Sequence, residues 1–137
     1  MSWLHLAATV EERAGRRCEY CRMHQSLQGA TFHLEHIVPE TKGGSSELDN
    51  LAWACPSCNL RKSDRIELTD SDTNDSVPLF QPRRDSWADH FRWDGLLAVA
   101  LTPIGRALIA TFDLNHLRRQ RIRQAEQLFD LFPLTDS

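Results

Sequence analysis

The chain has 137 residues, of which 41% are hydrophobic and 26% charged, and its formal net charge is −3. These values are ordinary for one soluble globular domain, and no run of about 18 apolar residues suggests a membrane-spanning helix. The first ten residues lack the basic start and apolar core of a signal peptide, so we expect a cytoplasmic protein with no membrane partner. The weak negative charge gives no global reason to expect a nucleic-acid partner, and such a function would have to come from a local site.

The beginning of the chain predicts a helix. Leu6, Val10 and Ala14 recur at four-residue spacing, and Gly15 follows where a helix can end. The first Cys-x-x-Cys pair comes directly after this segment.

Two short strands and a second helix are predicted next. Residues 32–38 form an apolar-rich run, residues 51–54 are a candidate partner strand, and the glycine- and serine-rich segment 42–46 is a flexible loop between them. A helix is expected to begin at residues 59–62. Residues 66–82 contain four acidic residues and no lysine or arginine, which suggests an acidic connection.

The C-terminal part predicts a β-hairpin and two helices. Asp94-Gly95 between two apolar segments is a two-residue hairpin signal, and Thr102-Pro103 is a typical helix start. Asn115 is the expected cap of a last helix that ends near Pro133. The expected apolar stripe of this helix consists of Ile122, Ala125, Phe129 and Phe132.

Two groups of residues in the C-terminal part, one aromatic and one of arginines, can each be interpreted as structural or as functional. We expect the aromatic residues Trp87, Phe91 and Trp93 to be core residues that cover the zinc module, with stacking on nucleic-acid bases as the alternative. The arginines Arg118, Arg119, Arg121 and Arg123 follow one another without an intervening acid. Such a cluster usually forms the solvated face of a helix, and a DNA-backbone contact is the alternative.

The four cysteines form two Cys-x-x-Cys pairs: Cys18 with Cys21, and Cys55 with Cys58. Each such turn can present two sulfur atoms to one metal ion, and two turns complete the tetrahedral set that Zn²⁺ prefers. Because four cysteine ligands leave no open position, the expected zinc site is structural. The 33 residues between the pairs form a long insert. Redox dithiols are the competing interpretation, but the thioredoxin-like context that they would need is absent.

The insert contains adjacent acidic and histidine residues in an apolar strand. Glu35 and His36 should project to opposite sides of that strand, so one can face a metal ion while the other faces water or a phosphate. Asn50 follows 14 residues after His36, and Asn59 follows nine residues later. His33 shares a strand face with Glu35, and we expect it to support the site or to be structural, with a further metal ligand as the alternative.

The segments Glu35-His36-Ile37-Val38-Pro39, Gly43-Gly44, Asp49-Asn50-Leu51, Cys55-Pro56-Ser57-Cys58-Asn59 and Lys62 together resemble the cysteine-flanked subgroup of the HNH endonuclease family. The resemblance covers residues 18–62 and implies a ββα-metal hairpin and helix. It implies a metal-dependent hydrolase that cuts phosphodiester bonds, with DNA as partner.

The resemblance assigns a role to each residue of the motif. It makes His36 the general base and Asn50 the residue that fixes the loop beside it, and it makes Glu35 and Asn59 ligands of a catalytic divalent ion. Oxygen ligands favour a hard ion, Mg²⁺ or Mn²⁺. Lys62 lies on the same helix face as Asn59, and Lys62 and Arg61 are candidates for nucleic-acid contacts, with a solvated surface lysine as the alternative.

The sequence therefore predicts an α+β protein. We expect an HNH module with its zinc knuckle at 1–65, the acidic connection at 66–82, and a hairpin and helical extension at 83–137 that packs on the module as one domain. The competing function is a non-catalytic zinc-knuckle module that binds nucleic acid or protein. Such a module would not need a base and hard-metal ligands at these intervals.

Overall fold

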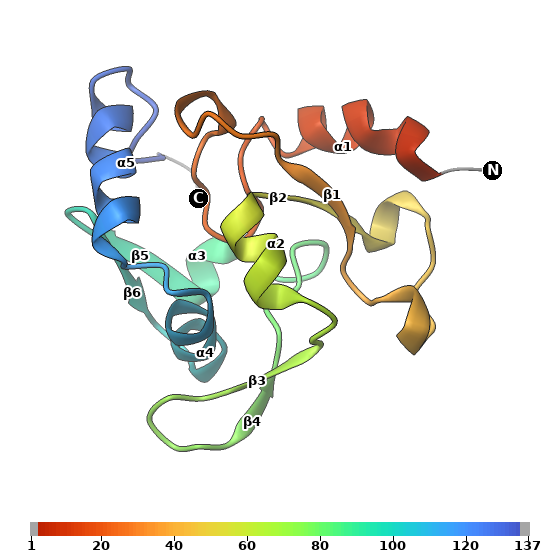
Figure 1. Cartoon of the computed structure of the whole chain (residues 1–137). Helices are drawn as coiled ribbons and strands as arrows, with labels where there is room; N and C mark the ends of the chain where they lie inside the picture. The colour runs from red at the N-terminus through yellow and green to blue at the C-terminus, as the bar shows by residue number, and fades with distance from the viewer. Residues whose placement is uncertain (1–2, 135–137) are drawn as a thin grey trace. The chain divides into compact units, whose positions relative to one another are not determined.

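The computed structural model describes residues 3–134 (Figure 1). The chain divides into two compact units, Met1–Ile66 and Glu67–Ser137. Both combine helices with small two-stranded antiparallel sheets, as expected for the α+β class. Within the described part of the chain, no helix is long and apolar enough to cross a membrane.

The first unit begins with helical segments, η1 (Trp3–Leu6) and α1 (Ala7–Arg13). Gly15, at φ +65°, follows α1 in the left-handed conformation that glycine adopts without strain, so the predicted helix and its end are confirmed. Val10 is the buried residue of α1. Arg13 donates to the carbonyl oxygens of Leu48 and Leu51, at 3.0 and 2.7 Å, which ties the helix to the start of the second strand.

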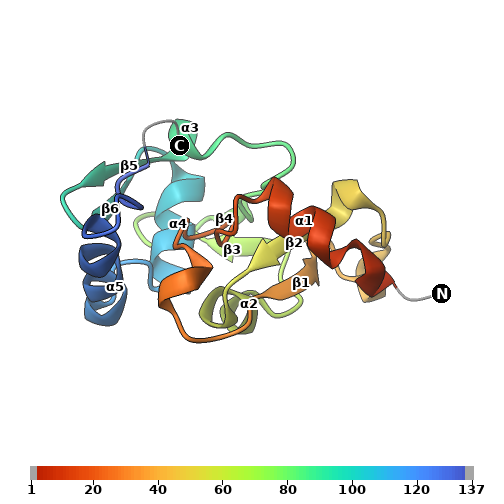
Figure 2. The same ribbon diagram turned by 90° about the horizontal axis from the view of Figure 1, so that it is seen from above.

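The two predicted strands pair as an antiparallel hairpin. β1 (His33–His36) pairs with β2 (Leu51–Ala54), with Glu35 opposite Ala52. All four residues of β2 are buried, and Figures 1 and 2 show the hairpin between α1 and α2. The connecting segments are short 3-10 helices, η3 (Glu40–Lys42) and η4 (Leu48–Asn50); a further one, η2 (Gln25–Leu27), precedes β1.

Helix α2 (Pro56–Lys62) starts earlier than the sequence predicted. Cys55 is its N-cap: the sulfur accepts a hydrogen bond from the backbone N–H of Cys58, and Pro56 occupies the first turn. Residues 59–62, expected to begin a helix, instead end one. The sequence analysis did not predict that Cys55, an expected zinc ligand, also caps this helix.

The second unit begins with a hairpin formed by β3 (Glu67–Thr69) and β4 (Ser76–Pro78). The expectation of an acidic connection over 66–82 did not include this hairpin. Its turn holds Asp70, which pairs through both carboxylate oxygens with the guanidinium of Arg106 on α4, at 2.9 and 2.8 Å. The acidic composition thus belongs to a folded turn with a basic partner.

The other hairpin and the helix after it follow the sequence prediction closely. β5 (Phe91–Asp94) pairs with β6 (Leu97–Ala100), and Gly95 in the turn has φ +59°. The two turn residues are Gly95 and Leu96, one position later than predicted. Helices α3 (Trp87–His90) and α4 (Pro103–Phe112) flank the hairpin in sequence, and Thr102 caps α4 as predicted.

The last helix, α5 (Leu117–Gln127), differs from the prediction in its cap and its end. His116 is the N-cap, because Asn115 bonds both the N–H and the carbonyl of Ala98 in β6, each at 2.8 Å. The helix ends before Phe129, which is 63% exposed, so the expected stripe through Phe129 and Phe132 does not exist.

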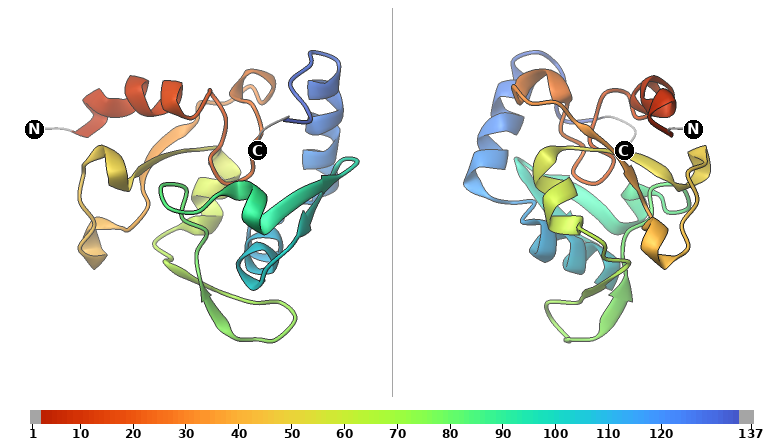
Figure 3. Two further views of the ribbon diagram at one scale, coloured as in Figure 1. Left: turned by 180° about the vertical axis from the view of Figure 1, so that it is seen from behind. Right: turned by 45° about the vertical axis from the view of Figure 1, so that its right-hand side comes forward.

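The aromatic residues of this unit form the predicted core cluster. Trp87 stacks on Phe91 and Trp93, with ring centroids 4.6 and 4.8 Å apart. Phe132 meets Trp93 edge-on at 4.8 Å. Figure 3 shows the β5–β6 hairpin beside α4 and α5.

Candidate active site

The four cysteines converge on one buried point. Their sulfur atoms all lie within 4.8 Å of one another, and those of Cys21 and Cys55 are 3.9 Å apart. A tetrahedral ion with bonds of about 2.3 Å to sulfur would place its ligands about 3.8 Å apart, so this spacing fits Zn²⁺. The sequence prediction that the two Cys-x-x-Cys turns are halves of one site is therefore confirmed, and the cluster is compatible with zinc.

The surroundings of the sulfur atoms are those of a metal site. The N–H groups of Cys21 and Cys58 point at the sulfur atoms of Cys18 and Cys55, at 3.5 and 3.3 Å. Burial raises the pKa values of the Cys18 and Cys58 thiols. Thiolates in such a place need a cation beside them, which a bound metal ion supplies.

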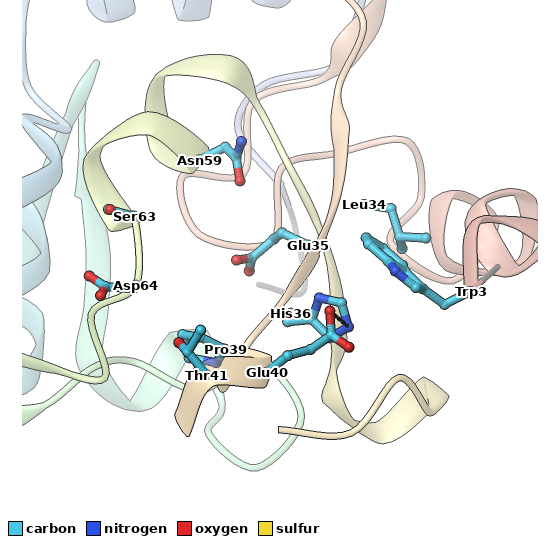
Figure 4. A pocket seen from close by; sticks show the side chains of 10 residues that line it. All are labelled: Trp3, Leu34, Glu35, His36, Pro39, Glu40, Thr41, Asn59, Ser63 and Asp64. Carbon is cyan, nitrogen blue, oxygen red and sulfur yellow. Dashed lines mark ion pairs between the residues drawn. The ribbon is translucent and has the colours of Figure 1, made fainter. Parts of the chain in front are cut away.

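An open pocket of about 350 Å³ lies in the same unit (Figure 4). Three of the expected site residues line it: Glu35 and His36 from β1, and Asn59 from α2. Figure 4 shows Glu35 directed toward α2 and His36 directed toward Trp3. The other lining residues are Trp3, Leu34, Pro39, Glu40, Thr41, Ser63 and Asp64.

Glu35 is a buried carboxylate with two strong partners. The Tyr20 hydroxyl donates to its Oε1 at 2.5 Å, and the Lys62 ammonium lies 3.1 Å from its Oε2. Burial raises the pKa of Glu35, while Lys62 and Tyr20 lower it. The pKa of Tyr20 is raised by burial and by the charge of Glu35, so the phenol stays protonated and remains a donor.

Lys62 does not occupy the position expected of a phosphate contact. Its side chain is fully buried, and its ammonium also donates to the backbone carbonyl of His36 at 3.0 Å. The buried ammonium therefore contacts two neighbouring residues of β1, through the carboxylate of Glu35 and the backbone carbonyl of His36. Arg61, the other expected nucleic-acid contact, is exposed on α2.

His36 is held on two sides of its ring. Its Nε2 lies 2.9 Å from the Ser46 hydroxyl, and the Trp3 ring meets the imidazole edge-on with centroids 4.3 Å apart. The carboxylate of Glu40, which is 63% exposed, lies 3.8 Å from the same Nε2. The imidazole side chain is only 10% exposed, so these contacts restrict its orientation.

Asn50 anchors the loop that carries Ser46. Its amide oxygen accepts from the N–H of Val38, and its amide nitrogen donates to the carbonyls of Val38 and Ser45, at distances between 2.7 and 3.0 Å. These bonds join Val38, before the glycine pair, to Ser45, directly after it. Gly44 is required there, because a Cβ atom would lie 1.7 Å from the Val38 carbonyl oxygen.

The donor set facing the pocket suits a hard divalent cation. Asn59 is half-buried, and among the described residues none hydrogen-bonds its side-chain amide. Glu35 has one partner on each oxygen, and a carboxylate offers about four lone-pair sites, so ligand positions remain. A carboxylate and an amide oxygen are ligands that Mg²⁺ and Mn²⁺ accept.

The sequence analysis missed three residues that contact the expected site residues. Tyr20 contacts Glu35, and Ser46 and Trp3 contact His36. His33, by contrast, is exposed and does not line the pocket. The one local signal for Tyr20 is its position between the two cysteines of a turn that lies next to a strand.

Comparison with known proteins supports the family resemblance. Searches of curated proteins and of solved structures gave no match. A family model described as HNH endonuclease matches residues 18–65, the segment that contains the cysteine cluster and all the expected site residues. Over this segment the chain is similar to HNH endonuclease domains.

Proposed function

We propose that this protein is a metal-dependent endonuclease that hydrolyses DNA phosphodiester bonds. The observation that carries the proposal is the pocket in which Glu35, His36 and Asn59 come together, beside a loop fixed by Asn50. In this proposal β1, β2 and α2 are the ββα-metal unit, and Zn²⁺ on the four cysteines stabilises it.

The proposed general base is His36. When its Nε2–H donates to the Ser46 hydroxyl, the lone pair on Nδ1 is left to accept a proton from water. The resulting hydroxide attacks phosphorus, the bond to the 3′ oxygen breaks, and the departing oxyanion takes a proton from a second water molecule, so that the products carry a 5′-phosphate and a 3′-hydroxyl. Asn50 contributes through the loop, by keeping Ser46 where it can orient the imidazole.

Glu35 and Asn59 are the proposed ligands of the catalytic divalent ion, Mg²⁺ or Mn²⁺. When bound, this ion supplies positive charge for the negative charge that develops on the phosphate oxygens. The protein's part is to hold two oxygen ligands rigidly at one wall of the pocket. Burial of Glu35 between Tyr20 and Lys62 supports that part.

The proposal is tested by nicking of supercoiled plasmid in the presence of Mg²⁺ or Mn²⁺. His36→Ala should lower the rate by about 10²- to 10⁴-fold, the usual cost of losing a general base. The matched control is His33→Ala, because His33 lies on the same strand but is exposed and outside the pocket. Its rate should equal that of the wild type.

Two outcomes would contradict the proposal. If His36→Ala cuts as fast as the wild type, the base has been assigned wrongly or the activity belongs to a contaminant. If the wild type cuts neither DNA nor RNA with Mg²⁺, Mn²⁺, Ni²⁺ or Co²⁺, a zinc-knuckle binding module becomes the better interpretation. Asn59→Ala should instead raise the Mg²⁺ concentration needed for half-maximal rate.

A further inference from the structure

Tyr20, one of the two residues between the sulfur ligands of the first cysteine turn, contacts Glu35, which lines the pocket. Tyr20 is fully buried, and its hydroxyl donates to Oε1 of Glu35 at 2.5 Å. That distance is typical of a hydroxyl donating to a carboxylate, which is among the stronger hydrogen bonds in proteins. The two groups are 15 residues apart in sequence, so only the fold brings them together.

The backbone around Tyr20 is rigid for reasons that involve the cysteines. The N–H of Cys18 bonds the carbonyl of Met23, and the N–H of Arg22 bonds the carbonyl of Cys18, which closes a tight turn. The N–H of Glu19 donates to the carbonyl of Trp53 at 2.8 Å. The turn is therefore fastened to β2, the strand that pairs with the strand carrying Glu35.

We propose that Tyr20 is a positioning residue through which the cysteine turn fixes the orientation of Glu35 as a ligand of the catalytic ion. The inference rests on the proposed function, because it takes Glu35 to be such a ligand. The hydroxyl occupies one lone pair of Oε1 and holds the plane of the carboxylate, leaving other lone pairs free to meet the ion. Order in the four-cysteine site thereby sets the affinity of a second, separate metal site.

The experiment uses the full chain loaded with zinc and measures Mn²⁺ binding directly, by electron paramagnetic resonance of free Mn²⁺, without any nucleic acid. Tyr20→Phe removes only the hydroxyl. It should raise the Kd for Mn²⁺ by about 10- to 100-fold, the usual cost of losing a group that orients a metal ligand. Zinc content by elemental analysis should remain that of the wild type.

Two variants frame the measurement. Met23→Leu alters a buried side chain of the same turn at nearly constant volume, and it should leave both metals bound as in the wild type. Glu35→Gln removes the proposed ligand charge itself, and it should abolish measurable Mn²⁺ binding. In cleavage assays Tyr20→Phe should recover most of its rate at high Mn²⁺, since His36 is untouched.

The outcomes separate this inference from the proposed function. If Tyr20→Phe binds Mn²⁺ as the wild type does while Glu35→Gln does not, the positioning role is wrong and the proposed function stands. If Glu35→Gln also binds normally, Glu35 is not a ligand and both fail. If Tyr20→Phe loses zinc, the hydroxyl serves the cysteine turn rather than Glu35, which also overturns the inference.

Discussion

The two units both bury charged side chains, but they use them differently. In the first unit, the buried ion pair of Glu35 and Lys62 lies at the wall of a pocket, and Glu35 lines that pocket. In the second unit, Arg119 and Arg123 are buried to satisfy backbone carbonyls: Arg119 donates to Phe112, and Arg123 donates to Leu96 and Leu114.

The comparison shows that a buried charged side chain indicates a functional site only when its hydrogen-bond partners leave it able to bind a ligand. Two nitrogen atoms of the Arg123 guanidinium donate to main-chain oxygens, and the group also lies 4.9 Å from the centre of the Trp93 ring. Glu35, by contrast, lines an open pocket. The arginine cluster is therefore not one solvated face: Arg118 and Arg121 are exposed, whereas the other two belong to the core.

The largest expected effect breaks the first unit at its cysteines. Cys55→Ser removes one sulfur of the cluster but keeps a side-chain oxygen that can cap α2, so the change tests the metal site rather than the cap. Structural zinc contributes about 10–16 kcal/mol of apparent binding free energy in small zinc-dependent peptides, so this variant should lose zinc and the fold of the first unit. Elemental analysis and amide dispersion in NMR spectra measure both losses.

Leu60→Ala is the control for this change, because Leu60 lies on the same helix and is 80% exposed. It should keep its zinc and its spectrum. Purified Cys55→Ser protein with a full complement of zinc and an unchanged melting curve would contradict the assignment of the cluster as a structural zinc site.

A smaller effect is expected from the second unit's buried arginine. Arg123→Met leaves the carbonyls of Leu96 and Leu114 without their charged donor, and we expect a loss of about 3 kcal/mol in the free energy of unfolding. Arg121→Met, at an exposed position of the same helix, should change it by no more than about 0.5 kcal/mol. Urea denaturation followed by tryptophan fluorescence measures both.

The same two variants, Arg123→Met and Arg121→Met, can also be compared for their binding to DNA. If Arg123→Met weakened binding to DNA while leaving stability unchanged, the buried arginine would have a functional role after all. The comparison between the two units would then fail at this residue.

The smallest effect depends on pH. The guanidinium of Arg106 and the N–H of Asp72 hold the pKa of Asp70 well below its usual range. A carboxyl group with a lowered pKa in the folded state stabilises the fold fully above its unfolded-state pKa of about 3.9, and this contribution is lost as pH falls below that value. Asp70→Asn should therefore melt below the wild type at pH 6, and the difference should shrink toward pH 2.

Asp72→Asn is the control for this pH dependence, since Asp72 is 68% exposed and reaches Arg106 at 3.3 Å from the edge of the turn. Its difference from the wild type should be small at every pH. A difference for Asp70→Asn that stays constant from pH 6 to pH 2 would show that the ion pair does not contribute as described.

Local signals in the sequence predicted much of the fold. The spacing of Leu6, Val10 and Ala14 gave the first helix, and Thr102-Pro103 gave the start of α4, because caps and periodicity act over one or two turns. The cap of the last helix was predicted one residue too early, because Asn115, a good cap by type, bonds Ala98 instead. A competing partner 17 residues away cannot be read from a local pattern.

The sequence by itself determined which residues meet. The cysteine spacing predicts the cluster, and the motif predicts Glu35, His36 and Asn59, which line one pocket. This was possible because the motif combines residue type and interval over a single hairpin and helix, where strand alternation and helical turns place side chains predictably.

Only the tertiary structure decided what surrounds those residues. Lys62 turned inward to Glu35 rather than outward to solvent, Tyr20 reached the same carboxylate from the cysteine turn, and Ser46 met His36. Each of these contacts joins residues between 10 and 27 positions apart, and the choice of partner depends on how the loops close and on which charges lose their water. A buried ammonium needs an anionic partner, and in this fold the partner of Lys62 is the carboxylate of Glu35.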